Sequence, residues 1–223
     1  MSGELTRTKA SHRHPLDWYV EQGWEWDMIM RQIGTDPELA DDAAIWDPCA
    51  GFGHSGSRLE SWGFGRIYLS DLVENVAYDD FLIRPIYFSG DFLEQSAPPE
   101  SPCSIFFNPP YSYIKGIGEA FVRHALQLAT HRVVALFPIK WLSGGKVRGR
   151  LFRFDHPPQQ VLYFMQRPSM PPGDLIEAMG SRAYRGGQID YCALVWDVRR
   201  PTAPGDTRSI WLPRFDDPIE GIA

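Results

Sequence analysis

The tetrapeptide Asn108-Pro109-Pro110-Tyr111 has the residue types best suited to one specific chemistry. It follows an apolar run, where two prolines are unexpected because each removes a backbone donor. The Asn108 side-chain oxygen and a proline carbonyl can each accept one N–H of a planar amine, which turns the delocalised lone pair of that amine toward an electrophile. The prolines hold the carbonyls in place before the substrate arrives. Tyr111 offers an aromatic face on which a flipped-out base can stack.

A glycine turn, DPCAGFG at residues 47–53, closes an earlier apolar run. Glycines let the backbone pass close to a ligand and turn into a helix whose N-terminal amides face the pocket. The spacing matches neither the dinucleotide-binding fingerprint nor a P-loop. The carboxylate of Asp47, just before the turn, can hold an ammonium or a hydroxyl group.

Two more acidic residues close the next two apolar runs. Asp71 follows the turn by about 20 residues, a position from which a carboxylate can take both ribose hydroxyls of a nucleoside. Asp91 can accept from an adenine amino group, and Phe92 can cover the ring. Each carboxylate alone also fits an ordinary solvated charge, but three at successive strand ends, with the glycine turn, predict a nucleoside-type cofactor.

The elements that must position these residues follow from apolar runs that alternate with helical patterns. Residues 117–130 have an apolar stripe at helical spacing, and a shorter helix is expected over about 55–62. Repeated strand–helix–strand units predict a mostly parallel sheet that binds ligands at the carboxyl ends of its strands. No long helix separates the last two strands, which predicts a terminal hairpin with one antiparallel strand. The predicted strands are residues 43–47, 66–71, 85–92, 103–110, 132–138, 159–165 and 190–196.

Length and composition suit one α/β domain, since the chain has 223 residues and 43% of them are hydrophobic. No apolar run approaches the roughly 18 residues of a membrane span, and residues 1–14 lack a signal-peptide core, so we expect a cytoplasmic protein without a membrane partner. The three cysteines are far apart and the six histidines show no metal-ligand spacing. Neither a disulfide framework nor a metal is therefore expected.

The expected organisation is a flexible N-terminus over residues 1–16, one domain over residues 17–200 and a C-terminal tail over residues 201–223. The tail begins in a segment rich in proline and glycine. Within it, Trp211 and Leu212 could dock back on the domain.

The motifs together resemble those of S-adenosylmethionine-dependent amino-methyltransferases that act on DNA, of the adenine-N6 or cytosine-N4 type. DPCAGFG is similar to the cofactor motif of that family, and NPPY is similar to its catalytic [DNS]-P-P-[YFW] motif. The likeness covers about residues 17–200. It is strongest to small proteins of phage and prophage type, in which a segment similar to Trp18-Tyr19-Val20-Glu21 precedes the cofactor motif.

This resemblance implies a fold, a cofactor and a set of site residues. The fold is the seven-stranded class I methyltransferase sheet with its last strand antiparallel, and the cofactor is S-adenosylmethionine. Asn108, Pro109, Pro110 and Tyr111 are implied to carry the chemistry. Phe52 departs from the family, in which a small residue is common at this point of the turn, and it would narrow the pocket. The residues implied to hold the cofactor are Trp18, Tyr19, Asp47, Pro48, Gly51, Gly53, Asp71, Asp91, Phe92 and Asn108.

The distribution of charge agrees with a DNA partner. Residues 1–111 contain 7 Lys and Arg against 18 Asp and Glu, whereas residues 112–200 contain 13 against 6. Such asymmetry indicates a polyanion-binding surface, although an ordinary solvated surface would show it too. Loops 139–153 and 166–188 would have to supply specificity, because little room is left for a separate recognition domain. Their basic residues, expected to contact phosphates, are Lys140, Lys146, Arg148, Arg150, Arg153, Arg167, Arg182 and Arg185, with Met170 and Tyr184 as candidate wedges or specificity contacts.

Several alternatives remain open. Adenine is favoured over cytosine as the base, but both present a similar amine to the same loop. RNA adenine and the side-chain amide of a protein glutamine pose the same chemical problem, and a degenerate, non-catalytic module of the same fold is a further possibility. Carbon-5 methylation of cytosine is rejected, because it needs a cysteine nucleophile at the working end of the strand, where Asn108 lies, whereas Cys103 begins that strand.

Overall fold

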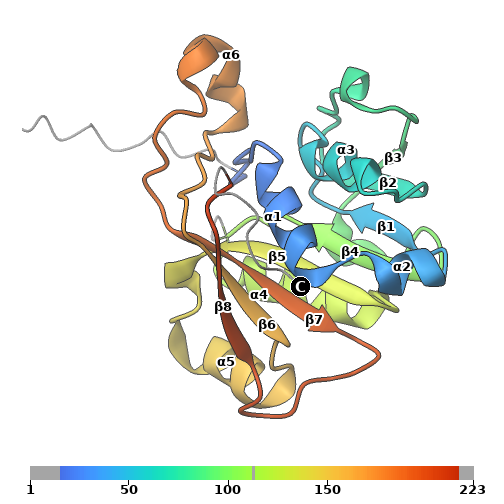
Figure 1. Ribbon diagram of the computed structural model, residues 1–223, viewed down its shortest axis with the longest axis vertical. Coiled ribbons are helices and arrows are strands. Elements are labelled where there is room, and N and C mark those ends of the chain that lie inside the picture. The colour runs from blue at the N-terminus through green and yellow to red at the C-terminus, as the bar shows by residue number, and fades with distance from the viewer. Residues whose placement is uncertain (1–15, 112–113, 216–223) are drawn as a thin grey trace, which may run out of the picture.

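The computed structural model describes residues 16–111 and 114–215, which form one sheet flanked by helices (Figure 1). The predicted flexible N-terminus lies outside the described residues except for Leu16. The end of the predicted tail, from residue 216 onward, also lies outside them. Within the described ranges, no helix is long and apolar enough to cross a membrane.

Eight strands form the sheet in the order β3-β2-β1-β4-β5-β7-β6-β8. The strands from β1 to β5 pair in parallel, β7 pairs antiparallel with β5 and β6, and β8 pairs in parallel with β6. One strand, β7, thus runs against the others, which confirms the predicted mostly parallel sheet. The bounds are β1 Ala44–Asp47, β2 Ile67–Asp71, β3 Ile86–Ser89, β4 Cys103–Phe107, β5 Arg132–Pro138, β6 Gln160–Phe164, β7 Tyr191–Asp197 and β8 Arg208–Leu212.

The eighth strand is one more than the resemblance implied, and it comes from the segment expected to be a tail. Along its whole length β8 pairs with the free edge of β6. Leu212 is buried against the domain, whereas Trp211 is 64% exposed and stacks on Tyr163 with ring centroids 5.4 Å apart. The short sequence of β8 carries a weak strand signal, so its conformation depends on hydrogen bonds that only β6 can supply.

Helices cover both faces of the sheet (Figure 1), and the alternation of side chains along each strand divides the core in two. In β4, Phe106 packs into the cluster that contains residues of α1 and α3, whereas Ile105 and Phe107 pack into the cluster of α4. Because both faces are covered, every residue of β4 is buried and all but Ser104 are apolar. The helices are α1 Trp24–Ile33, α2 Asp36–Ala40, α3 His54–Ser61, α4 Ile117–Leu128, α5 Gly145–Arg150 and α6 Ile176–Met179.

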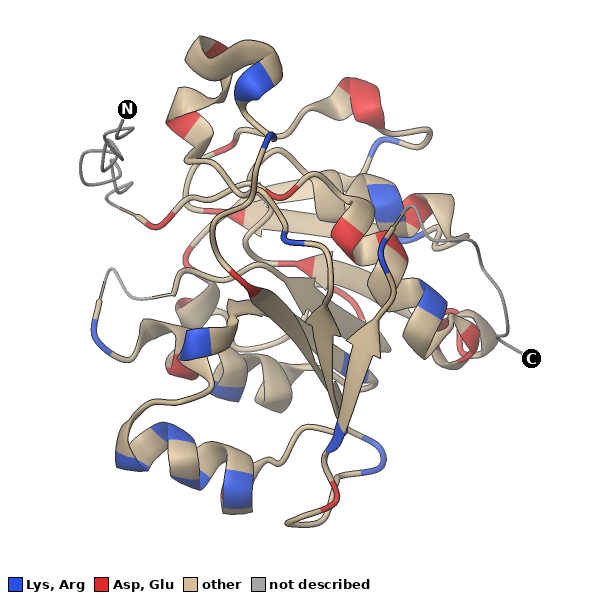
Figure 2. Ribbon diagram, turned by 60° about the vertical axis from the view of Figure 1, so that its left-hand side comes forward, with Lys and Arg blue, Asp and Glu red and all other residues tan. Residues whose placement is uncertain are grey.

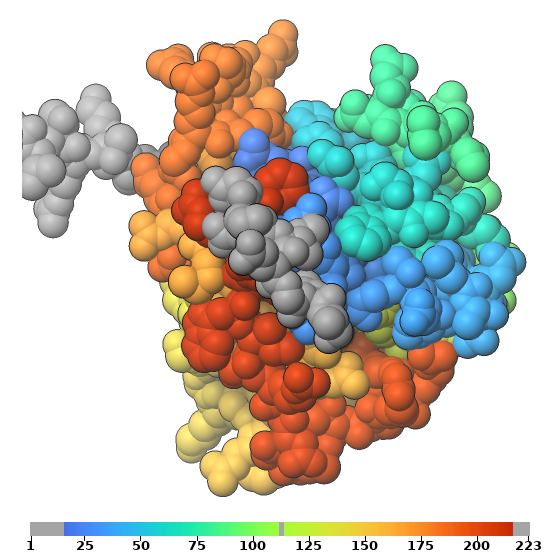
Figure 3. Space-filling view, viewed as in Figure 1, coloured from blue at the N-terminus to red at the C-terminus, as the bar shows by residue number. Residues whose placement is uncertain are grey.

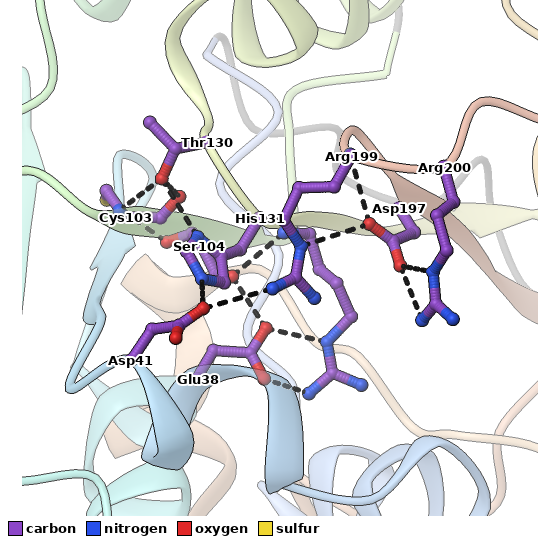
Figure 4. Close-up of polar contacts among 10 residues, drawn as sticks. Glu38, Asp41, Cys103, Ser104, Thr130, His131, Asp197, Arg199 and Arg200 are labelled. Carbon is purple, nitrogen blue, oxygen red and sulfur yellow. Dashed lines mark hydrogen bonds and ion pairs between the residues drawn. The ribbon is translucent and has the colours of Figure 1, made fainter.

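A buried ion pair ties helices to the sheet at the amino ends of the parallel strands (Figure 4). Arg132, the first residue of β5, donates from both Nε and Nη2 to the carboxylate of Glu38 in α2, with 2.6 Å between Nε and Oε1. Its guanidinium also donates to the carbonyls of Ile33, at 3.0 Å, and Gly34, at 2.8 Å, where α1 ends. The Ser104 hydroxyl donates to the same carboxylate at 2.7 Å. The pair therefore joins α1, α2, β4 and β5.

Candidate functional site

A cavity of about 310 Å³ lies where β1, β2, β3 and β4 end, at the opposite edge of the sheet from the Glu38–Arg132 pair. The strand order reverses between β1 and β4, the position at which open α/β sheets bind ligands. Figure 3 shows the surface hollowed between an orange projection around α6 and a green projection that follows β2. Of the predicted cofactor residues, the cavity wall contains Trp18, Tyr19, Pro48, Gly51, Asp71, Asp91, Phe92 and Asn108.

The carboxylate of Asp47 stabilises the glycine turn that follows β1 through hydrogen bonds within the turn and to α3. This carboxylate accepts the Cys49 backbone N–H at 2.8 Å and the Ser55 hydroxyl, and burial raises the pKa of Asp47 to about 8. Asp47 and Gly53 lie outside the described wall of the cavity. Gly53 has φ 85° at the start of α3, a conformation that favours glycine. Both residues thus shape the turn rather than face the cavity.

Asp71 and Asp91 present carboxylates to the cavity from the ends of β2 and β3. Asp71 accepts the backbone N–H groups of Gly51, at 3.0 Å, and Leu72, at 2.7 Å. Burial raises the pKa of Asp71. Asp91 is exposed and accepts the Leu93 N–H at 2.9 Å. Because a carboxylate has about four acceptor positions, both groups can still accept hydroxyl or amino donors of a ligand.

The ring of Phe92 contributes to the wall from a fixed position. It is buried and packs edge-on against Trp46, with centroids 5.2 Å apart, and against His124, with centroids 4.9 Å apart. A planar ligand ring can therefore contact its remaining surface without rearrangement of this core.

The segment from Asp17 to Glu21 forms one side of the cavity because it is bonded to the loop that precedes α6. Val20 N donates to Pro171 O at 3.0 Å, and Gly173 N donates to Trp18 O at 3.0 Å. A side chain at Gly173 would lie 2.3 Å from the Trp18 ring, so the indole needs glycine there.

Phe52, expected to narrow the pocket, lines it and packs edge-on against Trp18 with centroids 5.3 Å apart. Gly51 beside it has φ 50°, and a Cβ there would lie 2.9 Å from Trp18 Nε1. The turn therefore packs closely against the indole of Trp18. The volume of the remaining cavity, about 310 Å³, is at the low end of the roughly 300 to 1,000 Å³ that is typical of ligand pockets.

Asn108 follows β4 and is held at both ends of its amide. Its Nδ2 donates to the Tyr19 carbonyl at 3.0 Å and to Glu21 Oε2 at 2.9 Å. Its Oδ1 accepts the Tyr111 hydroxyl. Of the two prolines between Asn108 and Tyr111, the first is buried and the second lines the cavity. The predicted catalytic residues thus lie together at the cavity edge.

The ring of Tyr111 packs against three other aromatic side chains. It lies 13° from parallel to Tyr19, with centroids 6.5 Å apart, and also contacts Phe137 and Tyr191. The hydroxyl lies 3.8 Å from Met170 Sδ. Burial raises the pKa of Tyr111 well above its usual value, so the hydroxyl is a neutral donor at physiological pH.

A second cavity, of about 540 Å³, adjoins the first. Asp17 and Tyr19 line both, and Tyr111 lines the second. Asp17 is buried and has φ 55°, an uncommon conformation outside glycine, at the boundary between the two. Asn108 and Tyr111 therefore lie where a ligand in one cavity can meet a ligand in the other.

The predicted DNA-binding residues do not form one cluster. Of this set, Lys140 and Arg185 line the second cavity. Several of the others lie on separate projections: α5, which contains Lys146 and Arg150, and α6, which is followed by a turn with Arg182, are at opposite ends of the molecule (Figures 1 and 2). The predicted set is Lys140, Lys146, Arg148, Arg150, Arg153, Arg167, Arg182 and Arg185, and all but Arg148 are exposed.

Arg148 is the member of this set whose position is least suited to phosphate. Its guanidinium donates to the Trp141 carbonyl and lies over the Trp141 ring, 4.8 Å from the centroid. Arg150 pairs with Asp155 at 3.0 Å, but its side chain remains 74% exposed. Arg148 therefore holds the loop before α5 in place, whereas Arg150 can still reach a ligand.

Two residues of the site received no role from the sequence. Glu21, in the segment that precedes the glycine turn, contacts Asn108 directly. His54, the first residue of α3, lines the cavity, and its Nδ1 donates to the Glu21 carbonyl at 2.6 Å. Position just after the glycine turn was the available signal for His54, whereas Glu21 had none beyond its segment. Among residues 16–111 and 114–215, no group of three or more His, Cys, Asp or Glu could hold a metal ion.

Comparison with known proteins places the fold. No protein-family model matches the sequence, and no curated protein matches it either. Among solved structures, a proposed RNA methyltransferase from Pyrococcus horikoshii superposes with a TM-score of 0.60 and 15% identity, over 86% of this chain and 92% of that chain. A proposed class I S-adenosylmethionine-dependent methyltransferase from Listeria monocytogenes gives 0.57 and 13%, over 86% and 66%. A proposed hemolysin from Lactococcus lactis gives 0.57 and 12%, over 85% and 93%.

This similarity concerns the fold, because sequence identity is low throughout. The chain has the class I methyltransferase fold, a Rossmann-like α/β sheet. The predicted fold class is thereby confirmed, with eight strands in place of seven.

Proposed function

We propose that this protein transfers a methyl group from S-adenosylmethionine to the exocyclic amine of a base in DNA, with adenine N6 favoured. The observation that carries the proposal is the position of Asn108, between two adjoining cavities, with its amide oxygen directed toward Tyr111. The first cavity suits the cofactor and the second suits the base. Fold similarity alone leaves the substrate open, and the P. horikoshii protein is described as an RNA methyltransferase.

In the first cavity, the nucleoside part of the cofactor has candidate partners among the lining residues. Asp71 is placed to accept the two ribose hydroxyls and Asp91 the adenine amino group, while Phe92 contacts the adenine ring. Trp18 and Phe52, which pack edge-on against each other, also line this cavity. S-adenosylmethionine supplies, when bound, a methyl group already activated on a sulfonium, so the protein has to orient an amine rather than generate a strong nucleophile.

Asn108 would provide that orientation. Its Oδ1 accepts one N–H of the base amine, and a carbonyl of the Pro109-Pro110 pair accepts the other, which turns the lone pair toward the first cavity. The amine nitrogen would then be oriented to take up the methyl group that S-adenosylmethionine supplies, with the electron pair of the carbon–sulfur bond left on sulfur. The extra proton on nitrogen is lost to water afterwards.

The Tyr111 hydroxyl would give up its hydrogen bond to Asn108 Oδ1 when the base binds. This oxygen is the one assigned to the base amine. A base in the second cavity replaces the hydroxyl at that oxygen and stacks on the Tyr111 ring, a contact worth about 1 to 3 kcal/mol per base. The adjoining ring of Tyr19 narrows the same space.

The decisive test is methyl transfer from labelled S-adenosylmethionine to unmethylated DNA, with the digested nucleosides identified by mass spectrometry. N6-methyladenine or N4-methylcytosine establishes the reaction and the base. Product on RNA alone, in a parallel reaction, assigns an RNA substrate instead. Bound cofactor without product on either nucleic acid favours a protein glutamine substrate, and absence of cofactor binding favours a non-catalytic module.

Loss of the Asp71 carboxylate should weaken cofactor binding. Hydrogen bonds to a charged acceptor contribute about 1.5 to 3 kcal/mol each, so Asp71→Ala is expected to raise the Kd for S-adenosylmethionine at least about tenfold. Isothermal titration calorimetry measures this directly. The matched control is Asp79→Ala, which removes an exposed carboxylate outside the cavity wall. Equal affinity in Asp71→Ala and the wild type would remove Asp71 from the cofactor site.

Exposed basic residues of α5 are expected to contact DNA phosphates. Lys146→Ala and Arg150→Ala should each weaken DNA binding across sequences and reduce the slope of log Kobs against log salt by about one. Fluorescence anisotropy over a salt series gives the slope. Arg200→Ala is the control. Arg200 is exposed just after the end of β7, at the edge of the sheet that lies opposite the two cavities. An unchanged slope in both α5 variants would exclude this helix from the interface.

A further inference from the structure

Glu21 is a buried carboxylate in direct contact with the reacting side chain of the proposed site. It is 7% exposed, and its Oε2 accepts Asn108 Nδ2 at 2.9 Å. Its Oε1 accepts the indole N–H of Trp26 in α1 at 3.1 Å. Its backbone carbonyl accepts His54 Nδ1 at 2.6 Å, which fixes the main chain at this point. Both ends of the carboxylate are therefore engaged.

The chemistry of these partners permits one orientation of the Asn108 amide. An ionised carboxylate has acceptors only, whereas the two ends of an asparagine amide are nearly equal in shape but opposite in hydrogen-bonding character. With Glu21 and the Tyr19 carbonyl on one side, Asn108 must turn its NH2 toward them and its oxygen toward Tyr111. A rotation of the amide by half a turn would place two acceptors against its oxygen and offer a donor to the substrate amine, whose delocalised lone pair accepts poorly.

We propose that Glu21 is a positioning residue, which acts through Asn108 by keeping the amide oxygen directed at the substrate amine. The inference rests on the proposed function for its catalytic consequence and on the hydrogen-bonded geometry for its physical basis. It implies that the residue types at positions 21 and 108 depend on each other. Trp26 constrains residue 21, because an indole nitrogen can only donate and so requires an acceptor atom from that residue.

Each single substitution should then replace the hydrogen bond between residues 21 and 108 with a contact between two donors or between two acceptors. In Glu21→Gln, the indole N–H of Trp26 donates to the new amide oxygen of residue 21. The new NH2 group of residue 21 then faces the NH2 group of Asn108, and two donors meet. In Asn108→Asp, two carboxylates face each other at hydrogen-bond distance, and like charges at close range are unfavourable. When the two substitutions are combined, the new NH2 at position 21 donates to the new carboxylate at position 108, whose second oxygen remains available to the substrate.

The test compares wild type, Glu21→Gln, Asn108→Asp and the combined variant, with kcat measured at saturating S-adenosylmethionine and nucleic acid. We expect kcat to fall at least about tenfold in Glu21→Gln and about 10²-fold in Asn108→Asp. The combined variant should recover to within about tenfold of the wild type. Recovery is incomplete because the Tyr19 carbonyl still loses its donor. The Kd for the cofactor, measured by calorimetry, should stay near the wild-type value throughout.

A matched control separates this contact from a general effect of charge. Glu94→Gln removes one negative charge from an exposed side chain that does not line either cavity. Combined with Asn108→Asp, it should give no recovery of kcat. Recovery with Glu94→Gln as well, or a combined Glu21→Gln and Asn108→Asp variant no faster than Asn108→Asp alone, would overturn the positioning role.

Thermal unfolding provides a readout that does not depend on activity. The loss in Tm of the combined variant should be smaller than the sum of the two single losses, because each substitution corrects the mismatch created by the other. If the wild type methylates no substrate, the proposed function fails, while a non-additive Tm still supports the pairing of Glu21 with Asn108. Additive Tm losses would overturn the inference whether or not the wild type is active.

Discussion

Asn108→Ala is expected to lower the rate of methyl transfer by about 10²- to 10³-fold, the typical cost of removing one preorganised polar group from a reacting centre. The substitution removes the oxygen that would accept from the base amine. The predicted cofactor contacts of Asp71 and Asp91 remain, since these side chains come from other strands. The Kd for S-adenosylmethionine should therefore change little. Single-turnover transfer and isothermal titration calorimetry measure the two quantities separately.

Gln127→Ala is a suitable control for Asn108→Ala, because it also removes an amide but from an exposed position on α4. It should leave both the transfer rate and the cofactor affinity unchanged. If Asn108→Ala transferred methyl groups at the wild-type rate, the tetrapeptide would be a structural turn and the chemistry would lie elsewhere.

Glu38→Ala is expected to lower the free energy of unfolding by about 3 to 5 kcal/mol, because it leaves the charge of Arg132 buried and uncompensated. Glu38 is fully buried and Arg132 is 4% exposed. The remaining acceptors of the guanidinium, the carbonyls of Ile33 and Gly34, are neutral. Equilibrium unfolding in urea gives the difference. The pair lies at the far edge of the sheet from the cavities, so the folded fraction should keep its affinity for the cofactor.

A second arginine–carboxylate pair of this chain serves as the comparison. Arg167 and Asp190 are 2.6 Å apart, and both side chains are more than half exposed. Surface pairs contribute about 0 to 1 kcal/mol, so Asp190→Ala should have a small effect. Similar losses in Glu38→Ala and Asp190→Ala would show that burial does not determine the contribution of the Glu38–Arg132 pair.

Much of the sheet could be predicted because its central strands are mostly apolar runs. β4 and β5 are buried on both faces, so their sequences alone distinguish them from the segments around them. Helix α1 received no prediction, although Trp26, Ile29 and Met30 are buried at helical spacing. Its polar residues and the glycine on either side obscured that pattern. β8 was missed for another reason, since it depends on the edge of β6 for its hydrogen bonds.

The positions of the candidate site residues at strand ends followed from the sequence, whereas the directions of their side chains did not. Asp71 and Asp91 face the cavity, as their positions at strand ends suggested. Asp47 is also at a strand end, but its carboxylate is turned back to Cys49 and Ser55. The position of a residue at a strand end follows from the local sequence, whereas the direction of its side chain depends on which donors the fold brings close.

The class of the fold and the residue types at the carboxyl ends of the strands follow from the sequence, because apolar periodicity and short motifs are local properties. The arrangement of those side chains depends on the tertiary structure. Glu21 and Asn108 are 87 positions apart, and no local pattern relates them. The direction of the Asn108 amide and the boundary between the two cavities both result from contacts between distant segments. Hydrogen-bond direction depends on the neighbours that folding supplies, which local sequence does not specify.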